Sequence, residues 1–204
     1  MKKKRLLMIG IIAIVIIAVV LLVLRIFGSG GRAIDNEAEA SITGEKDTLV
    51  VYFSWSGNVQ QMARWVADEA DADIIRVTPT EAYSADFDDC TDRAEEELNN
   101  GTRPEITIEL TQEQLEQYDT IYVGFPVWWY DLPMPMWTFM ESYDFSGKTI
   151  IPFLSHNGSS NGASSLSTLE KLATNATVLK DDYLSIRGSS VSGSEQDVRD
   201  WVKN

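Results

Sequence analysis

Short apolar runs alternate with helical patterns from residue 49 to the end of the chain. We predict strands at residues 49–53, 73–78, 120–125 and 149–154, and a fifth strand within residues 177–186. Directly after the first run, Val59, Met62, Ala63, Val66 and Ala67 recur at helical spacing and predict an amphipathic helix. Similar patterns predict helices at residues 87–100, 133–143 and 162–173 and from residue 194 onward. Strands that alternate with helices imply a parallel sheet covered on both faces, so we expect an α/β fold.

Two details qualify this arrangement. Pro152 lies inside the fourth predicted strand, although proline lacks the backbone N–H that a central strand donates to its neighbour. Residues 106–108 predict a short edge piece, and Thr111 and Gln114 have the spacing of a capping box that begins a short helical turn.

A long apolar segment precedes all of these elements. Residues 6–24 are apolar except for Gly10, and a helix of this length spans roughly the 30 Å hydrocarbon core of a bilayer. We predict a retained membrane anchor, with a cleaved signal peptide as the alternative. Four basic residues precede the segment and only Arg25 and Arg32 follow it closely, which favours a cytoplasmic N-terminus and an extracytoplasmic domain.

The chain therefore divides into three predicted parts. Residues 1–27 form the N-terminal membrane anchor, residues 28–47 form a flexible tether that begins with Gly28, and residues 48–204 form one domain.

Charge is distributed unevenly over these parts. Six of the 17 basic residues and none of the 31 acidic residues lie in the first 32 positions, so the remaining 11 basic residues leave a net charge of −20. Such a domain repels nucleic acid and favours basic partner surfaces. Cys90 is the only cysteine, which excludes an intramolecular disulfide, and no spacing of His, Cys and carboxylates predicts a metal site.

Three loops leave the carboxyl ends of predicted strands, where ligands bind in parallel sheets. The first, Ser54–Asn58, joins a strand to a helix N-terminus and combines backbone N–H groups with hydroxyl and amide side chains. This loop predicts an anion cradle suited to phosphate, built without Lys or Arg. The alternative is that Ser56 or Asn58 only caps the helix.

The second loop, Pro126–Asp131, places Trp128, Trp129 and Tyr130 directly after a strand. Adjacent tryptophans cannot both point into one core, so at least one ring is expected to be exposed, where a planar ligand can stack on it. The alternative is that one tryptophan packs on the following helix with Trp137 and Phe139 while the other forms a protein interface.

The third loop, Ser155–Gly162, is rich in small hydrogen-bonding residues that can face the polar edge of a heterocycle. It contains His156, the only histidine, which is either a solvated side chain or a group that supplies a proton to a redox heterocycle.

Three motifs in this order resemble the flavodoxin family. They are Ser-Trp-Ser-Gly-Asn-Val at residues 54–59, Gly-Phe-Pro-Val-Trp-Trp at residues 124–129 and Tyr-Asp-Phe-Ser-Gly-Lys at residues 143–148. The similarity continues through residues 155–158 and 184–188. It implies an α/β, flavodoxin-like, doubly wound five-stranded parallel sheet with strand order 2-1-3-4-5, here after an N-terminal transmembrane helix.

The resemblance also implies non-covalent binding of flavin mononucleotide (FMN). The implied cofactor-binding residues are Ser54, Trp55, Ser56, Gly57, Asn58, Val59, Pro126, Val127, Trp128, Trp129, Ser155, His156, Asn157 and Gly158. Three positions depart from the family pattern: Val59 replaces a threonine, and Asn157 and Ser160 stand where relatives often have glycine.

By this resemblance, the protein is expected to be an electron-transfer protein that exchanges electrons with redox partner proteins. The apolar segment at residues 6–24 implies that it is membrane-tethered. If its domain is extracytoplasmic, the expected electron donor is a membrane component such as a quinol-linked reductase. Two alternatives remain open: an FMN-dependent NAD(P)H-linked quinone or nitro reductase, and a flavin-free acidic binding module. Whether the protein is an enzyme is therefore undecided by the sequence.

Overall fold

Two sheets form in the part of the chain that the computed structural model describes, residues 39–158 and 160–204. The larger has seven strands, and its order is β1 (Ala40–Ser41), β3 (Asp73–Arg76), β2 (Thr48–Tyr52), β6 (Thr120–Pro126), β7 (Thr149–His156) and β8 (Thr177–Val178), with β9 (Leu184–Arg187) also paired to β7. The smaller sheet pairs β4 (Thr78–Pro79) with β5 (Ile106–Thr107).

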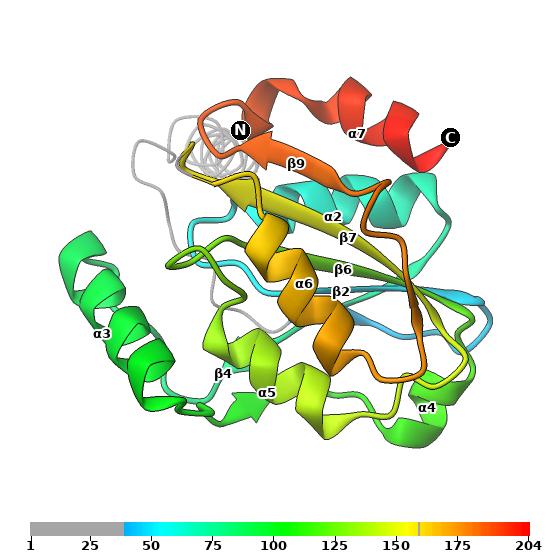
Figure 1. The fold of residues 1–204 in the computed structure, drawn as a ribbon. Coiled ribbons are helices and arrows are strands. Elements are labelled where there is room, and N and C mark those ends of the chain that lie inside the picture. Colours follow the sequence, from blue (N-terminus) through cyan, green and yellow to red (C-terminus); the bar gives the residue numbers. More distant parts are fainter. Residues whose placement is uncertain (1–38, 159) are drawn as a thin grey trace, which may run out of the picture. The chain divides into compact units, whose positions relative to one another are not determined.

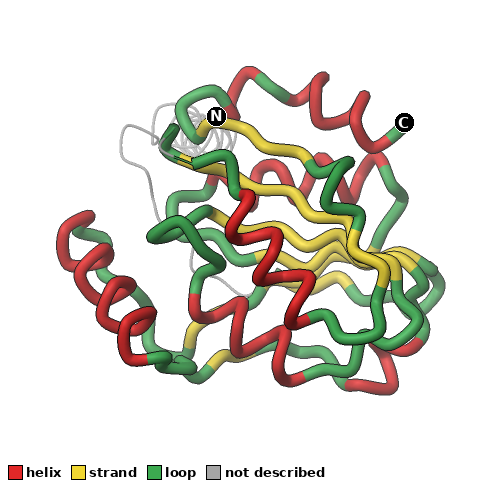
Figure 2. Tube along the Cα trace, viewed as in Figure 1, coloured by secondary structure: helices red, strands yellow, loops and turns green. Residues whose placement is uncertain are grey.

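Helices cover both faces of the large sheet (Figure 1). The elements are α2 (Asn58–Glu69), α3 (Phe87–Asn100), α4 (Gln112–Glu116), α5 (Met134–Ser142), α6 (Ala163–Leu172), the 3₁₀ helix η1 (Val191–Gly193) and α7 (Glu195–Val202). Figure 2 shows the strands as one twisted layer, with α2 and α7 on one side and α5 and α6 on the other. The predicted capping box at Thr111 is present at the start of α4.

The core divides into two layers because side chains alternate along a strand. In β2, Leu49 and Val51 face the layer that contains Phe139 of α5, whereas Val50 and Tyr52 face the layer that contains Val66 of α2. The two apolar layers hold the loops at the carboxyl ends of the strands on a rigid base.

The predicted order 2-1-3-4-5 is observed if the parallel strands are numbered along the chain with β2 as strand 1. Across the sheet, β3 (strand 2), β2 (1), β6 (3), β7 (4) and the β8–β9 pair (5) then follow one another. Five strands was too few. The additional edge strand β1 runs antiparallel to β3 and comes from residues predicted to belong to the tether.

The fifth predicted strand is split in two, which explains how β7 tolerates Pro152. β8 pairs with β7 as far as Ile150, and β9 resumes the pairing at Phe153. The Ile150 carbonyl accepts from Leu179 N–H, on the side of β7 that faces β8 and β9. Residues two apart in a strand direct their backbone polar groups to the same side, so the Pro152 nitrogen also faces β8 and β9. The missing N–H therefore falls in the gap between β8 and β9.

No helix within residues 39–158 and 160–204 has the length and apolar character needed to cross a bilayer. The predicted anchor at residues 6–24, and the predicted tether as far as residue 38, lie outside the described residues.

Candidate functional site

The first loop places the bare N-terminus of α2 at the carboxyl edge of the sheet. Gly57 is the N-cap residue, with a φ of 85°, and no side chain caps the helix. Neither Ser56 nor Asn58 therefore plays the capping role that was the alternative prediction. The buried Ser54 hydroxyl instead accepts from Gly57 N–H at 3.2 Å, which fixes the loop. The first-turn N–H groups and the helix dipole remain available to an anion.

A residue that sequence reasoning missed, Arg76, supports this loop from behind. β2 and β3 pair in parallel with Tyr52 opposite Arg76, so the Arg76 side chain lies beside the residues that follow β2. Its Nη2 donates to the Ser54 carbonyl at 2.8 Å, and Arg76 also makes a further interaction within the chain. The sequence signal that could have revealed this role is an arginine between the apolar residues Ile75 and Val77, where a charge is not expected to be buried without a partner.

The second loop is a two-residue β-hairpin turn with an unusual backbone. Trp128 N–H donates to the Asp131 carbonyl at 3.1 Å, and Asp131 N–H donates to the Trp128 carbonyl at 2.8 Å. The two residues between them, Trp129 and Tyr130, have φ values of 47° and 64°. Asn-Gly usually fills such turns, because other residues pay about 1–2 kcal/mol for the left-handed conformation.

This strain holds two aromatic rings toward solvent, since Trp129 is 42% and Tyr130 57% exposed. Trp129 Nε1 donates to the Thr91 carbonyl of α3 at 3.0 Å, which fixes its indole. Strained backbone of this kind concentrates at functional sites.

The neighbouring Trp128 is half-buried and belongs to an aromatic cluster. Its ring meets Phe53 edge-on at 5.2 Å between centroids and Tyr83 at 4.9 Å. The prediction that at least one of the adjacent tryptophans is exposed is thus confirmed. The specific alternative, in which a tryptophan packs on the following helix with Trp137 and Phe139, is replaced by packing against Phe53 and Tyr83.

The third loop is joined to both of the others. The buried Ser155 carbonyl accepts from Val127 N–H at 2.8 Å, which ties the end of β7 to the second loop. The His156 carbonyl accepts from Gly188 N–H at 2.9 Å. A Cβ at Gly188 would lie 2.6 Å from Asn58 Nδ2, so the end of β9 lies against the first loop and a larger residue 188 would displace the Asn58 amide.

His156 is held as a neutral side chain in this loop. Its Nδ1 accepts from Gly158 N–H at 2.9 Å, so the neutral ring carries its proton on Nε2. Burial, and then the nearby positive charge of Arg187, lower the pKa of His156 below its ordinary value. A neutral imidazole with Nε2–H can donate a hydrogen bond at pH 7.

Two predicted site residues turn away from the junction of the three loops. The Val59 side chain is buried in the core beneath α2, which leaves only its backbone for a ligand. The Trp55 side chain packs against the start of α3 and the segment before it. Its Nε1 donates to the Ser84 carbonyl at 2.9 Å, and its ring centroid lies 6.2 Å from that of Phe87. Sequence reasoning did not foresee that Tyr83 and Arg187 contribute to the surroundings of the site.

The donor set of the three loops fits a cofactor that combines a phosphate with a planar ring. Residues 54–59 and 155–162 contain no acidic side chain, and the one acidic residue of the second loop, Asp131, accepts through its carboxylate from Leu132 N–H at 2.7 Å. The uncapped end of α2 supplies N–H donors for phosphate, and the exposed indole of Trp129 supplies a stacking surface. Within the described residues, no group of three or more His, Cys, Asp or Glu side chains is placed to hold a metal ion.

Comparison with known proteins agrees with this description. A protein-family model described as flavodoxin matches residues 47–204. A flavoprotein from Bacteroides uniformis is 33% identical, with a TM-score of 0.64 over 78% of this chain and 98% of that one. A second, from Bacteroides eggerthii, is 26% identical, with a TM-score of 0.61 over 77% and 96%.

A flavoprotein from Lactobacillus acidophilus, solved in complex with FMN, is 25% identical, with a TM-score of 0.57 over 74% of this chain and 99% of that one. Comparison with curated proteins finds no match.

Proposed function

The chain belongs to the flavodoxin family over residues 47–204, and from this premise we propose that it binds FMN and transfers electrons while tethered to a membrane. The observation that carries the proposal is the uncapped N-terminus of α2, enclosed by two further loops whose aromatic and small polar residues suit a flavin. The Lactobacillus acidophilus relative in complex with FMN supports the same cofactor here.

The first loop holds the phosphate in this proposal. Ser54, Ser56 and Asn58 contribute side-chain donors, and the backbone N–H groups of Asn58 and Val59, in the first turn of α2, lie at the positive end of the helix dipole. The Ser54 hydroxyl accepts from Gly57 N–H and keeps its own proton available to the phosphate.

The second and third loops hold the ring. Pro126–Trp129 covers one side, with Trp129 as the exposed stacking surface, and Ser155–Gly158 lies along another edge. The Nε2–H of His156 and the N–H groups of the third loop are the donors on that edge.

Bound FMN supplies the redox chemistry, and the protein sets its potential and excludes water. The net charge of −20 over residues 33–204 opposes the addition of negative charge to the site and lowers its potential. Arg187, whose guanidinium lies about 3.1 Å from where a Cβ at Gly158 would stand, acts in the opposite sense. The acidic surface also steers basic redox partners toward the domain.

Residues 6–24 anchor the protein in the membrane in this proposal, with the N-terminus in the cytoplasm and the flavin domain outside. The length and apolar character of the segment and its four preceding basic residues support this arrangement.

The test is a titration of residues 34–204, the chain's second compact unit, with FMN and with riboflavin. The Bacteroides uniformis relative is almost wholly covered by its match to this region, so a domain of this extent stands alone as a protein. Quenching of flavin fluorescence should give a Kd for FMN at least tenfold below that for riboflavin, because only FMN engages the first loop. Ser54→Ala should remove most of this difference, whereas Ser142→Ala, at the end of α5, should leave it unchanged. Equal affinities, or no binding of either flavin, would refute the proposal.

A further inference from the structure

Arg187, at the end of β9, packs against the third loop of the site. β9 pairs with β7 so that Arg187 lies opposite His156, and Gly188 N–H donates to the His156 carbonyl at 2.9 Å. A Cβ placed on Gly158 would lie 3.1 Å from Cζ, 3.2 Å from Nη2 and 3.3 Å from Nε of Arg187. Because these distances are nearly equal, the flat face of the guanidinium covers the Gly158 backbone. The positive charge therefore lies directly beside the third loop.

No acidic group of the domain neutralises this charge. Other basic side chains are paired with carboxylates, as Arg103 is with Glu141 and Lys180 is with Glu170. Within the part of the chain that the structure describes, Arg187 forms no ion pair and its N–H groups make no hydrogen bond, although the chain has 31 acidic residues. An exposed guanidinium in this state can pair with an anionic ligand.

The alternation of side chains along β9 shows which part of the site Arg187 faces. Ile186 packs in the core layer that contains α2, so Arg187 points to the opposite face of the sheet. The N-terminus of α2, which is assigned to the phosphate, therefore lies on the side of Ile186. Arg187 instead contacts Gly158 in the loop that is assigned to the edge of the ring.

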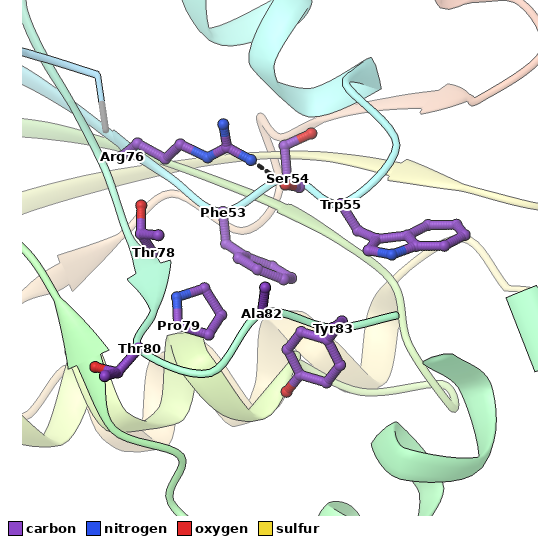
Figure 3. A pocket seen from close by; sticks show the side chains of 9 residues that line it. All are labelled: Phe53, Ser54, Trp55, Arg76, Thr78, Pro79, Thr80, Ala82 and Tyr83. Carbon is purple, nitrogen blue, oxygen red and sulfur yellow. Dashed lines mark hydrogen bonds between the residues drawn. The ribbon is translucent and has the colours of Figure 1, made fainter. Parts of the chain in front are cut away.

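Arg76 also contacts a loop of the site, but it binds protein backbone. It lies in the wall of a cavity of about 220 Å³ beside the first loop, where its Nη2 donates to the Ser54 carbonyl at 2.8 Å (Figure 3). Arg76 is buried, whereas Arg187 is exposed at the third loop. The two arginines therefore have different roles: Arg76 supports the protein, and Arg187 can act on a ligand.

His156 adds a neutral donor beside this charge. Its Nδ1 accepts from Gly158 N–H at 2.9 Å, and burial and then the charge of Arg187 lower the pKa of His156. The neutral ring keeps its proton on Nε2. The third loop thus combines an N–H donor and a nearby positive charge, and residues 155–162 contain no acidic side chain. Both features favour negative charge on a ligand at this loop.

We propose that Arg187 stabilises the negative charge that the flavin ring gains on reduction, and so raises the potential of bound FMN against the effect of the acidic domain. This inference rests on the binding of FMN proposed above. Reduction of a flavin by two electrons with uptake of one proton leaves one negative charge on the ring. The electrons come from the redox partner, or from dithionite in the test below. A group that favours this charge binds the reduced form more tightly than the oxidised one.

Anaerobic calorimetric titration of residues 34–204 with oxidised FMN and with dithionite-reduced FMN tests the proposal. Arg187→Gln should weaken the binding of reduced FMN about fivefold more than that of oxidised FMN, which corresponds to a potential about 20 mV lower for a two-electron couple. Riboflavin should show the same change, because the ring and not the phosphate is involved. The difference should fade in 1 M NaCl, because Arg187 is exposed. Equal weakening of both redox forms, or a change confined to FMN, would overturn the proposal.

¹H NMR of the same domain without FMN tests the placement of Arg187 separately. His156 is the only histidine, so its ring protons titrate without overlap in protein that carries no histidine tag. Arg187→Gln should raise the pKa of His156, because it removes a nearby positive charge. Arg187→Lys should keep both the lowered pKa and the preference for reduced FMN. Lys171→Gln, which removes an exposed charge at the far end of α6, is the matched control and should change neither.

The outcomes separate this inference from the function on which it rests. If the wild-type domain binds neither form of FMN, the proposed function fails and the role of Arg187 fails with it. If FMN binds and Arg187→Gln leaves the ratio of the two affinities unchanged, only the role of Arg187 is refuted. An unchanged pKa of His156 in folded Arg187→Gln would refute the placement of the charge at the third loop.

Discussion

The side chain of Arg76 supports the backbone of the first loop, which the proposed function assigns to phosphate binding. Because Nη2 of Arg76 donates to the Ser54 carbonyl, it fixes the peptide that orients the loop's N–H groups. A bond from a charged donor contributes about 1.5–3 kcal/mol, which corresponds to a factor of ten or more in affinity.

We therefore expect Arg76→Met to raise the Kd for FMN at least tenfold and that for riboflavin less than threefold, measured by flavin fluorescence. Arg76→Lys should recover part of the loss, because an ammonium group keeps one charged donor. Arg64→Met, on the exposed side of α2, is the matched control. If the affinities for both flavins fell equally, Arg76 would support only the fold.

Substitutions of the two adjacent tryptophans should have different effects, one mainly on the stability of the fold and the other mainly on the affinity for FMN. Trp128 packs against Phe53 and Tyr83, so Trp128→Ala should lower the free energy of unfolding by about 2–3 kcal/mol. Trp129 is 42% exposed, so Trp129→Ala should cost less, about 1 kcal/mol, but weaken FMN tenfold or more through the lost stacking surface. Urea unfolding and FMN titration of both variants check this. Unchanged FMN affinity in both would show that neither ring contacts the flavin.

At the scale of residues, the sequence predicts which residues form the loops after the strands, but not the backbone conformation of these loops. The first loop is readable because a strand pattern ends at Phe53 and a helix pattern begins at Val59. The left-handed turn at Trp129 and Tyr130 has no such signal, since its sequence lacks the Asn and Gly that announce it. Arg76 was missed because its role depends on strand pairing, which brings Ser54 beside it.

At the scale of elements, the apolar pattern predicts the five parallel strands but not the edge strand β1. Ala40–Ser41 is too short and too polar to show a strand pattern, and it is held by hydrogen bonds rather than by burial. The break between β8 and β9 was also not predicted, although Pro152 in the neighbouring strand β7 was one sequence feature that indicated it. Flavodoxin strand order came from the resemblance, because periodicity cannot order strands across a sheet.

Asp73 joins the segment after β1 to the sheet, and this link should be acid-sensitive. Its buried carboxylate accepts from Thr43 N–H and Oγ1–H, both at 2.9 Å, and from the Tyr118 hydroxyl at 2.8 Å. Burial alone raises the pKa of Asp73, but the bonds from Tyr118, Thr43 and Gly44 together bring it below the ordinary value of 3.8.

A lowered pKa in the folded state means that the carboxylate stabilises the fold fully above about pH 4, and that this stabilisation is lost as pH falls through the folded pKa. Asp73→Asn should therefore lower the free energy of unfolding by about 2 kcal/mol at pH 7, and by clearly less at pH 3. Urea unfolding at both pH values measures this. Asp181→Asn, at an exposed position, is the control and should change it by less than about 0.5 kcal/mol. A deficit that is the same at pH 3 would show that the charge of Asp73 contributes nothing.

At the scale of the whole molecule, charge separates the two ends of the chain. The only charged side chains among the first 32 residues are basic, and the remainder of the chain has a net charge of −20. Basic residues before an apolar segment are retained in the cytoplasm, while an acidic domain is repelled by anionic headgroups and faces basic partners. The basic N-terminal end therefore supports the proposed orientation, with the acidic domain outside the cytoplasm.

Expression of the full chain in a bacterial host tests this orientation. The protein should sediment with membranes and resist extraction by high salt, whereas a chain that lacks residues 1–33 should be soluble. In a Cys90→Ala background, Asn204→Cys should react with a membrane-impermeant maleimide in intact spheroplasts, because Asn204 is exposed. Lys3→Cys is the matched control and should react only after lysis.

The reverse labelling pattern would place the domain in the cytoplasm and exclude a donor on the outer side. A soluble product shortened at its N-terminus would show that residues 6–24 act as a cleaved signal. In either case the proposed flavin site would be unaffected, because every residue assigned to it lies after residue 53, within the α/β domain.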